Sequence, residues 1–131
     1  MSDYFANVKN YLSDLDLKIT HEDADEELVV VEDEARGIKG LVIDCEDPIL
    51  IMEQAILDLS SPGADILTRL LQMNRGLVHG AFALDEAGSK VIFRDTLQLA
   101  NLDFNEIEAT VNALSLGLAE YGNELIKFAQ K

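Results

Sequence analysis

Carboxylates are the most abundant residues of this chain that could do chemistry. The 131 residues include 25 Asp and Glu against 10 Lys and Arg, with two His and one Cys. Eight of the acids lie between Glu22 and Glu34, and calcium, magnesium and manganese prefer such oxygen ligands. A calcium loop of the EF-hand type also needs a central glycine, which the run after Asp23 lacks. We therefore expect a solvated acidic turn and strand edge here, with no metal site.

The histidines and the cysteine lack the neighbours that would make them catalytic. His21 and Glu22 begin an HExxH zinc pattern, but the second His is absent. Cys45 lies between Asp44 and Glu46, whose charges raise the pKa of its thiol, so we expect a structural residue near a strand end. With no catalytic set and no phosphate-binding glycine loop, the sequence predicts neither an enzyme nor a cofactor. A small metal-dependent enzyme stays open as an alternative, which titration with calcium, magnesium or zinc would test.

The net charge of −15 and the pI of about 4.2 limit the partners of the chain. Nucleic acids and anionic membranes are bound through clustered Lys and Arg, so this surface would repel both. Residues 1–61 hold 16 acids and 4 bases, whereas residues 62–131 hold 9 acids and 6 bases. No apolar run reaches the ~20 residues of a membrane span, and the N-terminus lacks the apolar core of a signal peptide. We expect a cytoplasmic protein without membrane insertion.

The first half of the chain is predicted to form one helix and several short strands. Apolar residues repeat at spacings of three and four from Tyr4 to Leu15, as on one face of a helix. Alternation over residues 17–22, the β-branched run 28–31 and the segment 40–43 predict strands separated by polar turns. The segment Pro48–Leu59 fits either a strand or a helix that begins at its proline, and the local pattern leaves both open.

A second helix is predicted after Ser61. This serine can cap the helix, with Pro62 at the first position, where no amide donor is needed. The segment from Ile66 to Met73 carries a broad apolar stripe, and Gly76 is well placed to stop the helix.

A hairpin and a long helix are predicted to follow. Residues 81–85 and 91–97 alternate as two strands joined by a polar turn. Asp103, with Glu106 three residues later, forms a capping-box pattern before the last helix. An apolar seam at alternating spacings of three and four runs through residues 104–128, and we expect most of it to be core.

This order of elements predicts an α+β fold. The order α-β-β-β(-β)-α-β-β-α places runs of strands between segregated helices. We expect an antiparallel β-sheet flanked by helices. No linker rich in Pro, Gly or Ser and no internal repeat divides the chain, so residues 1–131 are expected to form a single domain.

Two adjoining segments of the chain resemble a known family. Residues 66–74 read ILTRLLQMN, and residues 80–88 read GAFALDEAG. A helix that ends in Leu-x-x-x-Asn, followed by a hairpin of the form small–Phe–x–Leu–Asp–Glu–x–Gly, resembles the class I type III secretion chaperones and their YbjN-type relatives. The strand 91–95 and the acid-capped last helix also fit. The whole chain is most similar to the YjfI-like family of small acidic bacterial proteins, and this resemblance favours a strand for Pro48–Leu59.

The resemblance implies a function as well as a fold. Secretion chaperones of this type are often homodimers and hold an extended stretch of an effector by strand addition and apolar grooves. The resemblance implies no cofactor and no catalytic residues. YjfI-like proteins are often encoded near phage-shock-type membrane-stress proteins, which suggests such a protein as partner. The sequence itself contains no evidence for a secretion system.

We expect a non-enzymatic, chaperone-like protein-binding module that is a homodimer and holds a partner segment on its sheet. The candidate dimer contacts lie on the second helix and are Leu67, Leu70, Leu71 and Met73. The candidate partner-binding residues lie on the strands and are Leu28, Val30, Leu41 and Ile43. Each of these eight residues could equally belong to the core. In the run 28–31 both strand faces are apolar, and a helix, a second copy or a partner could cover the second one.

The charge supports a second class of function. A surface of this charge could act as an electrostatic regulator or decoy that occupies a basic protein, even one that normally binds nucleic acid. Added salt separates the two functions, because decoy binding weakens steeply whereas binding in an apolar groove persists. A partner recognised by charge should be basic and should meet the strands between His21 and Asp47.

Overall fold

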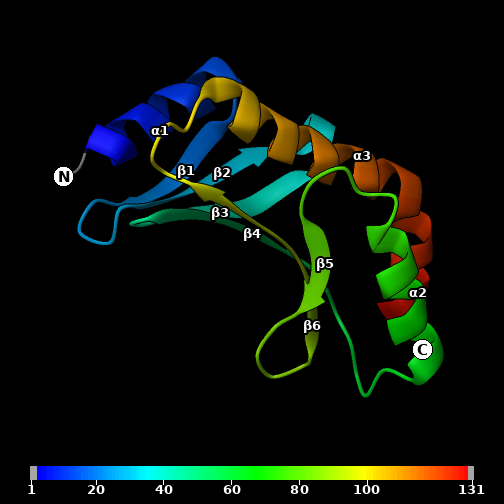
Figure 1. The fold of residues 1–131 in the computed structure, drawn as a ribbon. Helices are drawn as coiled ribbons and strands as arrows, with labels where there is room; N and C mark the ends of the chain where they lie inside the picture. Colours follow the sequence, from blue (N-terminus) through cyan, green and yellow to red (C-terminus); the bar gives the residue numbers. More distant parts are fainter. Residues whose placement is uncertain (1–2, 130–131) are drawn as a thin grey trace.

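The computed structural model describes residues 3–129, which form an α+β fold with a six-stranded sheet (Figure 1). The elements in chain order are α1 (Asp3–Asp14), β1 (Lys18–Asp23), β2 (Leu28–Asp33), the short 3₁₀ helix η1 (Glu34–Arg36), β3 (Ile38–Glu46), β4 (Ile49–Asp58), α2 (Ala64–Asn74), β5 (Ala81–Leu84), β6 (Lys90–Gln98) and α3 (Phe104–Ala129). The predicted order is confirmed, and the ambiguous segment Pro48–Leu59 contains the strand β4. None of the helices described has the length and apolar character that a membrane span requires.

The sheet is antiparallel throughout, with the strand order β1-β2-β3-β4-β6-β5. The first four strands follow one another as a meander, and the chain then passes through α2 to reach the far edge at β5. Strand β6 returns between β4 and β5. The two edges differ, because β1 consists mostly of exposed, charged or polar residues, whereas β5 is a short apolar strand.

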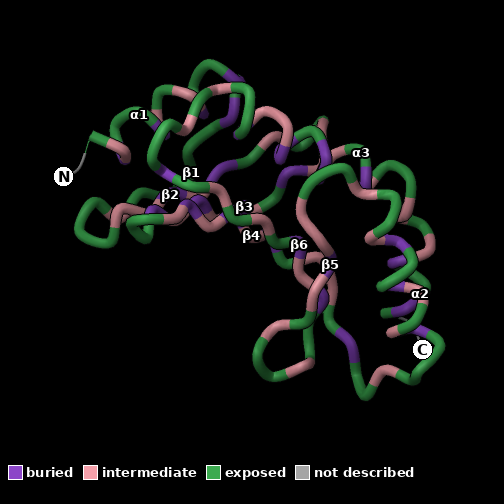
Figure 2. The backbone as a smooth tube through the Cα atoms, viewed as in Figure 1, coloured by how far each residue is buried: buried purple, intermediate pink, exposed green. Residues whose placement is uncertain are grey.

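The core lies between one face of the sheet and the helices (Figure 1). Along each central strand, buried residues alternate with half-buried ones, which Figure 2 shows as alternating purple and pink. Helix α3 buries most of its predicted apolar seam. Fully buried strand residues of this core include Val29, Val31, Ile38, Leu41, Ile43, Leu50, Met52, Val91 and Phe93.

The helix ends confirm one predicted cap and correct another. The carboxylate of Asp103 accepts a hydrogen bond from the backbone N–H of Asn105 at 2.8 Å, so it caps α3 as predicted. Ser61 does not cap α2, since the helix begins only at Ala64, with Gly63 at the N-cap position. Ser61 has a φ of +50°, and an N-cap residue needs an extended backbone, so the chain is still turning at this point.

The end of α2 is tied to the free edge of β5 by Asn74. The backbone N–H of Phe82 donates to Oδ1 of Asn74 at 2.7 Å, and Nδ2 of Asn74 donates to the carbonyl of Phe82 at 3.1 Å. A neighbouring strand would make the same two bonds, so Asn74 takes the place of one residue of such a strand. Gly80 allows the turn into β5, because its φ is +72° and a Cβ there would overlap the ring of Phe93.

Candidate functional site

The side of the sheet opposite the helices has no helix of residues 3–129 over it (Figure 1). We call this side the open face. Successive residues of a strand point to opposite sides, so the half-buried residues that alternate with the buried core lie here. The apolar residues of the open face are Leu28, Val30, Val42, Ile49, Ile51 and Ile92. Adjoining apolar side chains that remain partly exposed can mark surfaces that bind partners.

Strand pairing brings the residues of the open face into rows across the sheet. In one row Val30 on β2 pairs with Val42 on β3, and Val42 pairs with Glu53 on β4. Glu53 in turn pairs with Arg94 on β6, and the two side chains form an ion pair. The row is therefore apolar toward β2 and charged toward β6.

The next row has a carboxylate at its centre. Asp44 on β3 pairs with Leu28 on β2 and with Ile51 on β4, so its lateral neighbours are apolar. Its Oδ1 atom is buried and accepts no hydrogen bond from the described residues. Burial is the main cause that raises the pKa of Asp44 to about 6, and the nearby charge of Glu46 is the next.

Two of the predicted partner-binding residues lie on the open face and two do not. Leu28 and Val30 are half-buried there, whereas Leu41 and Ile43 are fully buried under the helices. The prediction is therefore wrong for Leu41 and Ile43, which are core residues. The reason is the register, because Val30 pairs with Val42, and a shift of one residue exchanges the two faces of a strand.

The predicted dimer contacts on α2 also divide into two kinds. Leu70 and Met73 point into the core and are 6% and 0% exposed, so they are not available to a second copy. Leu71 is 71% exposed, and Leu67 is half-buried. Of the four predicted dimer contacts, only Leu67 and Leu71 are therefore accessible to a second copy.

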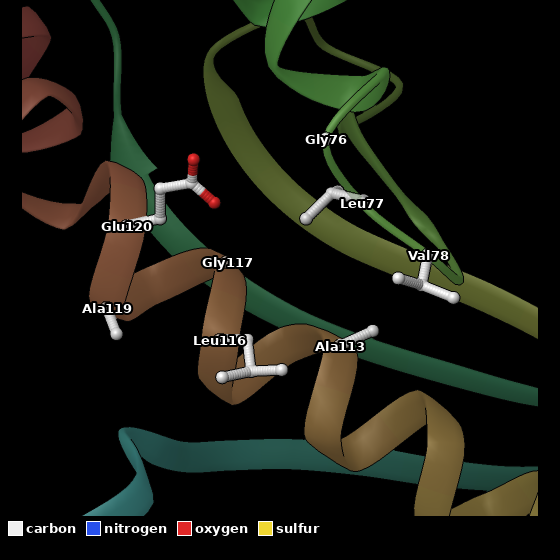
Figure 3. A pocket seen from close by; sticks show the side chains of 8 residues that line it. All are labelled: Gly76, Leu77, Val78, Ala113, Leu116, Gly117, Ala119 and Glu120. Atoms are coloured by element: carbon white, nitrogen blue, oxygen red, sulfur yellow. The ribbon is translucent and has the colours of Figure 1, made fainter.

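A second apolar surface is a groove of about 440 Å³ between α3 and the loop after α2 (Figure 3). Val78 on the loop and Leu116 on α3 are 80% and 67% exposed. Gly117 lets the loop approach, since a Cβ there would lie 2.7 Å from Leu77. The sequence pattern did not predict this groove. Leu116 lies outside the regular spacing of the apolar seam of α3, and this departure from the spacing indicates in the sequence that its side chain is exposed.

Cys45 and His21, which were considered above for catalysis or metal binding, lie apart from one another on the sheet. Cys45 lies on the covered face, and burial followed by the charge of Glu27 raises the pKa of its thiol to about 12. Its thiolate is therefore not formed near neutral pH, as expected for a structural residue. His21 is exposed on the edge strand β1. Within residues 3–129, no three His, Cys, Asp or Glu side chains are grouped so that they could hold a metal ion.

Comparisons with known proteins place this fold. It is similar to that of YbjN from E. coli, with 11% identity, a TM-score of 0.67 and 92% of each chain covered. It is also similar to a chain of the heterodimeric ExoU–SpcU complex from the type III secretion system of Pseudomonas aeruginosa, with 17% identity and a TM-score of 0.63 over 86% of this chain and 93% of that one. A third similar structure is the HopA1–SchA chaperone–effector complex, with 11% identity and a TM-score of 0.60 over 97% and 94% of the two chains. A search of curated proteins found no match.

These likenesses confirm the expected chaperone-like α+β fold. They do not confirm the narrower YjfI-like subfamily, which stays a prediction. The sequence model of the CesT_Tir_1 family matches residues 1–131, the full length of the sequence. The chain belongs to the CesT_Tir_1 family.

Proposed function

We propose that this protein is a non-enzymatic, chaperone-like binding module that holds an extended segment of a partner protein on its open face. The observation that carries the proposal is the group of half-buried apolar residues on a sheet face that no helix of residues 3–129 covers. The HopA1–SchA complex, in which a chaperone of similar fold binds an effector, supports it.

The dimensions of the central strands suit an extended segment. Strands β3 and β4 are nine and ten residues long and lie side by side at the centre of the open face. A segment of similar length, with alternate apolar side chains facing the sheet, would cover Val42 and Ile51 together. Each Å² of apolar surface removed from water contributes about 25 cal/mol, so several partly exposed residues give useful affinity only when they are covered together.

Site-specific photo-crosslinking tests this proposal and distinguishes the open face from the groove. A photoreactive amino acid is placed at Val42 in one variant and at Leu116 in another, and both are expressed in the source cell. We expect a cross-linked partner from Val42 and none from Leu116. Matched charge variants, Val42→Glu and Leu116→Glu, should respectively abolish and preserve capture of that partner. Cross-links from Leu116 alone would contradict the proposal.

The same cells and cross-linked samples test the identity of the partner and the compartment in which it is bound. A phage-shock-type membrane-stress protein is the partner that we propose from the resemblance, and the mass of the cross-linked protein tests it. We propose binding in the cytoplasm, which fractionation of the source cell tests. Capture at low and high salt separates apolar binding from an electrostatic decoy, which the comparisons do not favour.

We also propose that the protein forms a homodimer through the accessible side of α2. Leu67 and Leu71 are four residues apart and therefore lie on one face of the helix. Light scattering at high concentration should give the mass of a dimer for the wild type and that of a monomer for Leu71→Glu. A monomeric wild type would exclude this proposal. Ile126→Glu, which adds the same charge at another exposed apolar residue on α3, is the matched control.

A further inference from the structure

Binding of a purely apolar segment would not explain why a carboxylate, that of Asp44, lies among the apolar residues of the open face. Its row places it between Leu28 and Ile51, and Val42 lies two residues before it on the same side of β3. These apolar neighbours help to exclude water, and the buried Oδ1 accepts no hydrogen bond within residues 3–129. A buried carboxylate oxygen without a hydrogen bond raises the free energy of the folded protein. A hydrogen-bond donor placed against it would be stabilising.

The surroundings of Asp44 are also short of positive charge. After burial, the charge of Glu46, a side-chain hydrogen bond with Glu46, and the charges of Glu26 and Glu53 raise the pKa of Asp44 to about 6. These acids lie on β3, on the turn before β2 and on β4, so they approach from three elements. Arg94 lies on the same face, but it pairs with Glu53. The position of Asp44 therefore favours a cation brought by the molecule that covers this face.

Three kinds of occupant can be compared at this position. A metal ion needs several ligands at once, and no suitable group of three side chains occurs in the described part of the chain. A second copy would bring the acids of its own open face against these acids, which like-charge repulsion opposes. A Lys or Arg side chain of another protein fits both the charge of Asp44 and the apolar residues around it.

We infer that the partner segment on the open face carries a Lys or Arg between apolar residues, and that Asp44 accepts hydrogen bonds from its ammonium or guanidinium group. This inference rests on the proposed function, since it concerns the same face. In an extended segment alternate side chains share one side, so the expected pattern is apolar, any, basic, any, apolar. The basic residue then meets Asp44, and the apolar residues meet the neighbouring rows.

Selection from a random peptide library tests the inference without the natural partner. A displayed library of dodecapeptides is selected on the wild type, on Asp44→Asn and on Glu32→Gln. The Glu32→Gln variant removes an equal charge from an exposed residue of β2 and is the matched control. Peptides enriched on the wild type and on Glu32→Gln should carry a base flanked by apolar residues. Peptides enriched on Asp44→Asn should lack the base.

Binding of the enriched peptides then gives the size of the effect. Replacing the base by norleucine should weaken binding to the wild type about 10- to 100-fold, because a hydrogen bond between charged groups is lost. The same replacement should change binding to Asp44→Asn by less than about twofold. Asn has nearly the shape of Asp, and circular dichroism of each variant verifies that it is folded.

The two ways to fail are distinguishable through Val42→Glu. Absence of enriched peptides, or peptides that bind Val42→Glu as well as the wild type, would overturn the proposed function and this inference together. Peptides that need the open face but carry no base would overturn only the role of Asp44. The same holds for peptides that keep their preference for a base on Asp44→Asn.

Discussion

The two faces of the sheet are built from the same strands but differ in whether a polar side chain among apolar residues is fully hydrogen-bonded. On the covered face Gln54 is 4% exposed, and both ends of its amide are bonded. Its Oε1 accepts from the N–H of Lys39 at 2.9 Å, and its Nε2 donates to the carbonyl of Gly37 at 3.1 Å. On the open face Asp44 also lies among apolar residues, but its Oδ1 has no donor within the described chain.

This difference separates what stabilises the fold from what the fold offers to a partner. A buried polar group costs free energy unless it is hydrogen-bonded, and the covered face meets that requirement internally. The open face does not, although its apolar residues resemble those of the core in type. Hydrophobicity alone therefore does not distinguish the two faces, whereas satisfaction of polar groups does.

The largest expected difference between the faces is in the free energy of unfolding that is lost when a side chain is truncated to alanine. Ile43→Ala removes a fully buried side chain and should lower the free energy of unfolding by about 2–5 kcal/mol. Val42→Ala, one residue earlier on the open face, should cost less than about 1 kcal/mol. Urea unfolding followed by circular dichroism measures both. Equal losses would show that the open face is covered in the free protein.

Gln54→Leu tests the hydrogen bonding of the covered face. The change leaves the N–H of Lys39 and the carbonyl of Gly37 without the amide that now bonds them. We expect the free energy of unfolding to fall by about 1–3 kcal/mol. Gln98→Leu, at an exposed residue of β6, is the control and should have little effect. A neutral result at Gln54 would mean that water replaces its amide.

Asn74→Ala extends the comparison to the edge of the sheet. It removes both side-chain bonds to the backbone of Phe82 and should lower the free energy of unfolding by about 1–2 kcal/mol. Hydrogen exchange should quicken at the N–H of Phe82 more than at Phe93, which lies on the neighbouring strand β6. Unchanged protection of Phe82 would contradict the assignment of Asn74 as its partner.

The pH dependence of stability tests the environment of Asp44 on the open face. Its folded pKa of about 6 lies above the ordinary value of 3.8, so the native state binds its proton more tightly than the unfolded state. Asp44 therefore supports stability below about pH 4, and that contribution is lost as the pH rises through about 6. The gain in stability from Asp44→Asn should accordingly grow over this range.

Asp85 provides the control of opposite sign for this measurement. Backbone N–H groups of Lys90 and Ser89 donate to its carboxylate and lower its pKa. Its contribution is present above the ordinary value of 3.8 and is lost as the pH falls through the lowered pKa. Asp85→Asn should therefore destabilise the protein at neutral pH and matter less in acid. The same pH trend in both variants would contradict the environment described for Asp44.

Patterns within one element predicted the fold well, whereas properties that depend on two elements did not follow from the sequence. The seam of α3 and its Asp103 cap are local, and both are confirmed. The pairing of Val30 with Val42 depends on how two strands are aligned, so the wrong face was assigned to Leu41 and Ile43. The unsatisfied oxygen of Asp44 depends on several strands and could not be predicted from the pattern around it.

The bond between Asn74 and the edge of β5 has a consequence for how copies of this protein can assemble. Sheet proteins polymerise when the last strand of one molecule accepts the first strand of the next, which requires both ends of the sheet to be available. At β5 a side chain from α2 already occupies the backbone of Phe82, and at β1 exposed charges discourage docking. Further strand pairing is thus hindered at both edges, which opposes growth into fibres by a chain with a partly apolar open face.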